Sequence, residues 1–259
     1  MATGRLRPLV APWLSLLRQL VAASPLRWPG LPREMWRFLA SHRDFRRLAA
    51  ESGAMGSGQT RFHPALFDRD ALGFDAHYTF QAAWATRRIV GAAPPRHVDV
   101  SSDHRFVTQL ASCLPVLYVE FRPVPLGLAG LETRQGDVTA LPFQDQSIPS
   151  LSCLHVVEHV GLGRYGDPLD PLGHMKACRE LQRVLAPGGM LLLSVPVGRS
   201  GVWFNAHRVL DPASVAGLMP ELRLVEFCAV TGDGRYVEHA NPPDFRSEEY
   251  ACGMYRMTR

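Results

Sequence analysis

Residues 136–196 constrain the fold more than any other part of the chain. They contain two short apolar runs, at 150–154 and 190–195, with a helical stretch at 172–185 between them. A Pro-Gly-Gly turn leads into the second run. Strand–helix–strand order with nearly continuous apolar strands is typical of a parallel sheet that is covered on both faces. Polar residues follow the first run, at the edge where open α/β sheets bind ligands.

Other apolar runs extend this pattern along the chain. We expect further strands at residues 96–102, 116–120, 131–135, 222–230 and 250–257. Helices are predicted at residues 75–91, 104–113 and 212–218, and a polar loop at residues 232–248. Strands that alternate with helices indicate an α/β protein with a doubly wound sheet.

The N-terminal part differs from the rest of the chain in charge. Residues 1–50 contain nine Arg and two acidic residues, whereas the whole chain has a formal net charge of only +4. We therefore expect a basic, helical extension over residues 1–74, with a second basic helix at 33–51, and one domain over residues 75–259.

Several interpretations remain open for the first residues. Apolar side chains at positions 9, 13, 16, 17 and 20 follow helical spacing. They fit a helix docked on the domain, an interfacial membrane helix or a targeting peptide. A docked or solvated helix is the expectation, and a peripheral membrane contact through residues 1–23 is the alternative. Arg18 interrupts the longest apolar run, which is too short to span a bilayer.

The cysteines bear on the compartment. The five stand at positions 113, 153, 178, 228 and 252, without Cys-x-x-Cys or zinc-knuckle spacing. This pattern indicates reduced thiols and a cytoplasmic location. The basic N-terminus carries no recognisable nucleic-acid-binding motif, so nucleic acid is not an expected partner.

Ionisable side chains directly follow the run at residues 150–154. His155, Glu158 and His159 lie close together in the sequence. Histidine titrates near neutral pH and can act as a general base toward a hydroxyl or an amine. Packing is the alternative role for these rings. A metal site is not expected, because the His-Glu-x-x-His spacing of zinc enzymes is absent.

Two more segments bring polar and aromatic side chains to the same sheet edge. In the Gly-rich loop 161–170, Arg164 can hold a carboxylate or phosphate bidentately, and Tyr165 can stack on a ring. The alternative is a compact loop whose Arg and Asp side chains pair internally. Three residues beyond the next strand would join Arg164 around an acceptor pocket: Asn205, His207 and Arg208.

In this order, the motifs resemble those of class I S-adenosylmethionine-dependent methyltransferases. The resemblance covers about residues 95–259 and rests on Asp137 before Leu-Pro-Phe, on His-Val-Val-Glu-His after a strand, and on Leu-x-Pro-Gly-Gly. Residues 158–168 and 204–209 carry a narrower resemblance to the uncharacterised DUF268 group of methyltransferase-like proteins. The resemblance implies a Rossmann-like, mostly parallel sheet with an antiparallel last strand, and S-adenosylmethionine as the cofactor.

The resemblance also implies cofactor-binding roles at strand ends. Glu120 would accept hydrogen bonds from both ribose hydroxyls, since a carboxylate can receive two donors. Asp137 would accept one from the adenine amine, while the Val138 amide donates to a ring nitrogen. A helix before the first strand often covers the cofactor in this family, which makes three residues of 75–91 candidates to face the site: His77, Tyr78 and Gln81.

The turn after the first strand departs from the family pattern. That pattern is Asp-x-Gly-x-Gly-x-Gly, in which Gly lets the main chain approach the ligand. Here Asp99 opens the motif as expected, but Ser101 and Asp103 stand at the first two Gly positions. Asp99 and Ser101 are still expected at the cofactor.

The function implied is methyl transfer from S-adenosylmethionine to an oxygen or nitrogen of a small molecule or glycan. His155 or His159 would be the base, and His155 is favoured because it is the first polar residue past the strand. The alternative is a methyltransferase fold that has become a binding or interaction module. Ser101 and Asp103 are the residues that favour this alternative.

Overall fold

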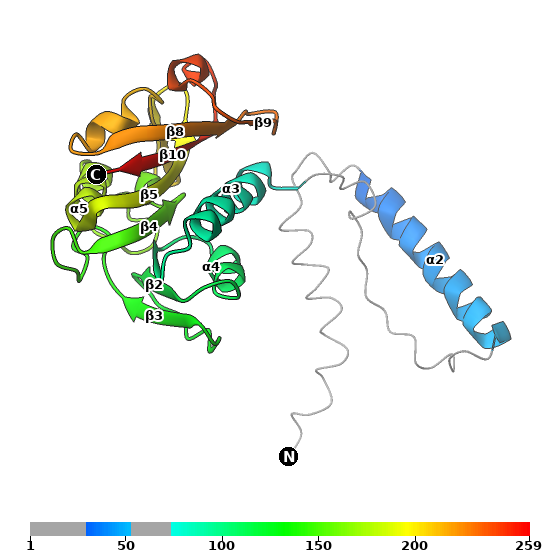
Figure 1. The fold of residues 1–259 in the computed structure, drawn as a ribbon. Coiled ribbons are helices and arrows are strands. Elements are labelled where there is room, and N and C mark those ends of the chain that lie inside the picture. The colour runs from blue at the N-terminus through cyan, green and yellow to red at the C-terminus, as the bar shows by residue number, and fades with distance from the viewer. Residues whose placement is uncertain (1–29, 53–73) are drawn as a thin grey trace. The chain divides into compact units, whose positions relative to one another are not determined.

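The computed structural model describes residues 30–52 and 74–259 (Figure 1). The chain divides into two compact units, residues 1–73 and 74–259. In the first unit, helix α2 (Leu31–Ser52) lies where the sequence predicts a basic helix. The predicted helix around residues 9–20 and the predicted membrane contact at residues 1–23 lie outside the described residues. None of the helices that the structure describes is long and apolar enough to cross a membrane.

Residues 74–259 are built on an eight-stranded sheet with the order β3-β2-β1-β4-β5-β10-β8-β9. The strands are β1 (His97–Val100), β2 (Val116–Glu120), β3 (Leu131–Gln135), β4 (Ile148–Leu154), β5 (Leu185–Val197), β8 (Arg223–Val230), β9 (Tyr236–Val237) and β10 (Ala251–Thr258). Strands β1 to β5 pair in parallel, and β10 is antiparallel to both β5 and β8. The predicted α/β class, mostly parallel sheet and antiparallel last strand are confirmed.

Helices cover both faces of this sheet (Figure 1). On one face lie α3 (Ala76–Ala92) and α4 (His104–Leu110), and α5 (Gly173–Val184) lies on the other. Successive residues of β5 point to opposite layers, so Leu192 packs with α3 and α4 while Leu193 packs with α5. Both sides of the central strands are therefore buried, which explains their nearly continuous apolar sequence.

The order of the strands determines where a ligand site is expected. Strand β1 lies between β2 and β4, so the chain leaves β1 toward one sheet edge and later returns on the other side. The carboxyl ends of β1, β2 and β4 thus diverge at a crevice, the usual ligand-binding position in open α/β sheets.

Two predicted segments differ from the structure. Residues 212–218 form only a short 3₁₀ turn, η5 (Val215–Leu218), because the backbone bonds there close over three residues, as from the Gly217 amide to the Ser214 carbonyl. The expected loop at residues 232–248 contains strand β9 and the 3₁₀ turn η6 (Pro242–Phe245).

A fully buried polar network joins β1 to β4. The His97 ring nitrogens each lie 2.8 Å from a hydroxyl, that of Ser150 at Nδ1 and that of Ser152 at Nε2. The Ser152 hydroxyl in turn donates to the Asp99 carboxylate, which also accepts from the Ser102 amide and hydroxyl. Burial lowers the pKa of His97 to about 3 and raises that of Asp99 to about 6. His97 is therefore neutral, and the network belongs to the interior of the sheet.

Candidate active site

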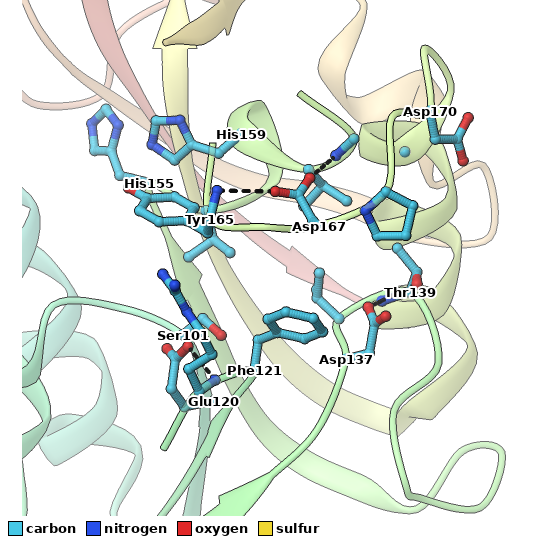
Figure 2. Close-up of a pocket in the computed structure, with 17 residues that line it drawn as sticks. Ser101, Glu120, Phe121, Asp137, Thr139, His155, His159, Tyr165, Asp167 and Asp170 are labelled. Carbon is cyan, nitrogen blue, oxygen red and sulfur yellow. Dashed lines mark hydrogen bonds between the residues drawn. The ribbon is translucent and has the colours of Figure 1, made fainter. Parts of the chain in front are cut away.

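A pocket of about 390 Å³ opens at the carboxyl ends of β1, β2 and β4 (Figure 2). A pocket of this volume is large enough for a small ligand. Seven of the residues predicted from the sequence line it: Ser101, Glu120, Asp137, Val138, His155, His159 and Tyr165. Ser101 and Glu120 lie at one side, Asp137 at another, and the two histidines with Tyr165 at a third (Figure 2).

Glu120 ends β2 and is held by its own neighbours. One carboxylate oxygen accepts a hydrogen bond of 3.1 Å from the Tyr118 hydroxyl, and the other accepts one of 3.1 Å from the Arg122 amide. These two bonds fix the carboxylate at the pocket wall. Each oxygen keeps a lone pair for another donor, so Glu120 can still receive two hydroxyls.

Asp137 lies in a tight turn after β3. Its Oδ1 accepts from the Thr139 amide at 2.8 Å and from the Thr139 hydroxyl at 2.7 Å. Asp137 therefore caps its own turn. Its Oδ2 accepts no hydrogen bond from the part of the chain that the structure describes, so one oxygen is free at the pocket. Val138 is buried beside it.

The turn after β1 is formed without the expected glycines. Ser101 adopts a left-handed conformation, with φ of 57°, and its amide donates to the Val119 carbonyl at 2.9 Å. Its hydroxyl turns to the same carbonyl, at 3.3 Å. Asp103 caps α4 by accepting from the Arg105 amide at 2.8 Å. Hydrogen bonds of the Ser101 and Asp103 side chains therefore stabilise the turn at which the methyltransferase pattern has glycine.

Asp99 does not reach the pocket, contrary to the prediction of a cofactor contact. It is fully buried, and both its oxygens accept hydrogen bonds from Ser102 or Ser152. Because its acceptors are used inside the sheet, Asp99 fixes the turn rather than binding a ligand.

His155 directly follows β4, with a positive φ of 55° and a buried ring. Its Nδ1 lies 2.7 Å from the Glu158 Oε1. Burial works against a charge on the ring, but interactions with the Cys252 sulfur and the Glu158 carboxylate outweigh it and raise the pKa of His155 to about 10. His155 is therefore an imidazolium at neutral pH and has no free lone pair to accept a proton, contrary to the preference for it as the base.

Glu158 lies behind the pocket rather than in it. It belongs to the 3₁₀ turn η4 (Val157–His159) and is completely buried. Its Oε1 faces both histidines, 2.7 Å from His155 Nδ1 and 3.8 Å from His159 Nε2. The expected direct role in chemistry is thus replaced by an electrostatic one, because the carboxylate cannot touch a ligand.

His159 has the properties of a neutral base. Its Nδ1 lies 2.7 Å from the Ala206 carbonyl, an acceptor only, so this nitrogen carries the proton. The Nε2 is then left with the lone pair. Burial lowers the pKa of His159 below its ordinary value of 6.5, which keeps the ring neutral at neutral pH. His159 lines the pocket and is the better candidate for proton transfer.

The loop after η4 crosses the pocket mouth. The Asp167 carboxylate accepts from the amides of Gly161, Gly163 and Tyr165, at 2.7 to 3.3 Å. Figure 2 shows Tyr165 beside His159, and their rings meet edge to face at 5.7 Å. Arg164 donates to the Ala206 carbonyl at 2.9 Å. The alternative pairing of Arg and Asp side chains within the loop is not seen, since Asp167 accepts from main-chain amides and Arg164 donates to a carbonyl outside the loop. Tyr165 faces the pocket.

Arg208 was predicted at the acceptor pocket, and the structure places it in the interior. It lies on β7 (His207–Val209) and donates to four main-chain carbonyls, at 2.7 to 3.4 Å: those of Glu158, Val160, Asp170 and Pro171. Only 4% of its surface is exposed. Its Nη donors fasten η4 and the following loop, so they are not available to an acceptor.

The hairpin that β7 forms with β6 (Gly201–Trp203) carries the other two predicted acceptor residues. Asn205 is exposed at its tip, and neither Asn205 nor His207 lines the pocket. The His207 ring contacts the rings of Trp203 and Tyr250, at 5.6 and 5.0 Å. The expected convergence with Arg164 is made through the Ala206 carbonyl instead.

Helix α3 supplies rings to the back of His155. The ring centroids of His77 and Tyr78 lie 5.9 and 5.4 Å from that of His155. Gln81 points into the core and accepts from the Ser194 hydroxyl, which is a packing role. None of these three residues lines the pocket, so the expected covering of the cofactor site by α3 is limited to ring contacts with His155.

Two contributors were missed from the sequence. Arg122 lines the pocket, and the Ala206 carbonyl orients His159. The position of Arg122, two residues past Glu120, could have indicated its role. The sequence does not reveal that a main-chain carbonyl orients a side chain. Among the described residues there is no group of three or more His, Cys, Asp and Glu side chains arranged to hold a metal ion.

Comparisons with known proteins agree with this architecture. Residues 145–233 match the family model described as Caenorhabditis protein of unknown function, DUF268. The [4+2]-cyclase SpnF is similar in structure, with a TM-score of 0.52 and 13% identity over 78% of this chain and 84% of that one. A putative sarcosine dimethylglycine methyltransferase from Galdieria sulphuraria has a TM-score of 0.50 and 14% identity, over 68% and 83% of the two chains.

The comparison with curated proteins finds no match. At 13% and 14% identity the structural likenesses concern the fold alone. The chain therefore has a Rossmann-like α/β fold that it shares with these two proteins, and its residues 145–233 match DUF268.

Proposed function

We propose that the protein transfers a methyl group from S-adenosylmethionine to an oxygen or nitrogen atom of a small molecule or glycan. One observation carries the proposal. Two carboxylates with free acceptor capacity, Glu120 and Asp137, line the same pocket as a neutral histidine, His159. This combination suits a nucleoside with two ribose hydroxyls and an exocyclic amine, next to a group that can take a proton.

The residues present fit that cofactor chemically. Glu120 would hold the ribose and Asp137 Oδ2 the adenine amine, with the buried Val138 against the ring. Ser101 would meet the amino-acid part through a turn whose hydroxyl is directed to β2 and away from the pocket. S-adenosylmethionine supplies an electrophilic methyl group when it is bound.

The chain's own contribution to the reaction is positioning and one proton transfer. His159 Nε2 would accept the proton that the acceptor hydroxyl or amine loses as its bond to the methyl group forms. The Glu158 carboxylate, 3.8 Å from that nitrogen, would stabilise the resulting imidazolium. His155, already charged, would balance Glu158 in the resting state.

The alternative is a binding module that keeps the fold without turnover. Two observations support this alternative. Ser101 stands where the methyltransferase pattern has its first Gly, and the similar structure SpnF is described as a [4+2]-cyclase rather than a methyltransferase. The fold by itself therefore does not fix the reaction.

We also propose a cytoplasmic location for the protein and a domain boundary near residue 74.

The test is calorimetric titration with S-adenosylmethionine and S-adenosylhomocysteine on the full chain, with Glu120→Ala as the matched variant. We expect both ligands to bind the parent and Glu120→Ala to bind at least about 10-fold more weakly, since hydrogen bonds to charged groups contribute about 1.5–3 kcal/mol each. Absence of heat with both ligands would refute the cofactor. Binding without methyl transfer to any compound in an acceptor library would favour the binding module.

A further inference from the structure

Two arginines flank the Tyr165 ring at the mouth of the pocket. The guanidinium carbon of Arg122, just past β2, lies 5.6 Å from the ring centroid, and that of Arg164 lies 5.2 Å from it. The two come from different loops that meet at this aromatic ring. Cation–π contacts of this kind hold the guanidiniums near the ring without using all their donors.

Neither guanidinium is neutralised by a carboxylate. Over residues 30–52 and 74–259, neither Arg122 nor Arg164 has an acidic side chain within 4.0 Å. The nearby carboxylates bind other groups: Asp167 accepts from three loop amides, and Glu120 accepts from the Arg122 amide and the Tyr118 hydroxyl. Positive charge at this rim is therefore available to a ligand.

A third arginine shows the contrast. The Arg134 guanidinium also lies over a ring, 5.9 Å from the centroid of Phe143. It has an ion pair with Glu132 at 3.1 Å and does not line the pocket. Stacking on a ring thus occurs elsewhere in the protein, but there the charge has a partner.

The unpaired charges lie beside the proposed reaction centre. Arg122 and Tyr165 line the pocket with His159. The Arg164 Nη1 lies 3.4 Å from the His159 Nδ1, and both groups share the Ala206 carbonyl. An acceptor that places a hydroxyl or amine at His159 would therefore carry its other end past these two arginines.

We propose that Arg122, Arg164 and Tyr165 form a phosphate subsite, so that the methyl acceptor is a phosphate ester. A phosphate monoester has three acceptor oxygens and can receive donors from two guanidiniums at once, whereas a carboxylate has two oxygens and is matched by one. The Tyr165 ring beside the arginines would contact the ester's carbon skeleton. This inference rests on the proposed methyltransferase function.

The experiment compares phenyl phosphate with benzyl alcohol, which keeps the ring and lacks the phosphate. Each is titrated into the full chain saturated with S-adenosylhomocysteine. We expect phenyl phosphate to bind, benzyl alcohol to bind much more weakly, and Arg122→Gln to weaken phenyl phosphate binding by about 10- to 100-fold. Arg164→Gln should act in the same direction, and the matched control Arg134→Gln should have no effect.

Two results would overturn the subsite. One is equal affinity for phenyl phosphate and benzyl alcohol, and the other is a loss of phenyl phosphate affinity in Arg134→Gln as large as that in Arg122→Gln. A failure of S-adenosylhomocysteine to bind would instead count against the proposed function. Phenyl phosphate is then titrated into the ligand-free chain, where an Arg122-dependent signal would support the anion site separately and its absence would refute it.

Vesicles distinguish a soluble ester from a lipid headgroup. If the phosphate belongs to a lipid, phosphatidylcholine vesicles containing phosphatidic acid should sediment the parent and release Arg122→Gln. If it belongs to a soluble acceptor, phenyl phosphate should bind and these vesicles should show no difference between the two proteins. Vesicle binding that Arg122→Gln leaves intact, together with no binding of phenyl phosphate, would contradict the subsite in both forms.

Discussion

Two buried polar clusters lie along the same strand, one beside the middle of β4 and one past its carboxyl end, and they differ in how completely their atoms are paired. Beside β4, His97 and Asp99 have hydrogen-bond partners for both ring nitrogens and both carboxylate oxygens. Past its carboxyl end, His155 Nε2 and Glu158 Oε2 are buried without a hydrogen-bond partner in the described chain. Complete pairing marks a structural network, and incomplete pairing marks a place where chemistry or a ligand is expected.

The histidines of the two clusters also differ in charge. Burial alone acts on His97 and lowers its pKa to about 3, so the ring stays neutral. His155 is also buried, but interactions with the Cys252 sulfur and the Glu158 carboxylate reverse the effect and raise its pKa to about 10. Burial therefore does not decide the charge of a histidine by itself, because the nearest charged partner can outweigh it.

The largest expected effect concerns the base. Replacement His159→Gln should lower turnover by about 10²- to 10⁴-fold, because it removes the lone pair that accepts the proton. Affinity for S-adenosylhomocysteine and the melting temperature should change little, because the amide side chain can still donate to the Ala206 carbonyl. Single-turnover kinetics, calorimetry and thermal unfolding measure the three quantities. Unchanged turnover would exclude His159 as the base.

The next effect separates His155 from His159. Replacement His155→Ala leaves the buried Glu158 charge without its partner, and breaking a buried pair costs about 3–5 kcal/mol. We expect a large loss in the free energy of unfolding, measured by urea denaturation. His159→Ala is the control and should cost much less. A His155→Ala protein of normal stability with lost turnover would restore His155 as the base.

The pH dependence of kcat/KM sharpens the same contrast. Activity requires neutral His159, whose pKa is lowered below 6.5, so the rate should be level at neutral pH and fall about tenfold per unit below that pKa. A second decline in kcat/KM is expected above about pH 10, where His155 loses its proton and Glu158 loses its charged partner. In His159→Gln the acid decline should disappear. A decline already present at neutral pH would contradict a lowered pKa.

The smallest effect should come from the structural cluster. Replacement Ser152→Ala leaves His97 Nε2 without a partner, at a cost of about 1–3 kcal/mol, while Asp99 Oδ2 keeps the Ser102 hydroxyl as a donor. Unfolding free energy should fall while kcat and the acid decline stay unchanged. Val98→Ala in β1 provides a comparison in which only apolar contact is lost. A shifted pH profile in Ser152→Ala would show that the two clusters are coupled.

Much of the fold could be predicted because it is encoded by local pattern. The central strands of a parallel sheet are buried on both sides, so β4 and β5 read as apolar runs that need no knowledge of their neighbours. The η5 segment was predicted as a longer helix because its composition is typical of helices. Composition does not show whether the backbone hydrogen bonds of a segment close over three residues or four. Local sequence identifies what an element can be, and packing determines where it ends.

The site was predictable only where a residue's role follows from its place at a strand end. Glu120 and Asp137 come directly after strands and do line the pocket. Arg208 and Asp99 are equally polar and equally close to strands, yet they point inward. Arg208 binds main-chain carbonyls that are remote in the sequence, and Asp99 binds the nearby Ser102 together with the remote Ser152. No side-chain motif encodes such an arrangement.

The Ala206 carbonyl has a consequence for how this site can change over time. It selects the tautomer of His159 and also holds Arg164, yet it belongs to the main chain. No exchange of the side chain at position 206 can delete it. The hairpin tip around it, with Phe204 and Asn205 exposed, is thus free to vary in sequence while the proton stays on the same nitrogen. Acceptor preference and base chemistry can diverge independently, because the atom that supports the base is common to every amino acid.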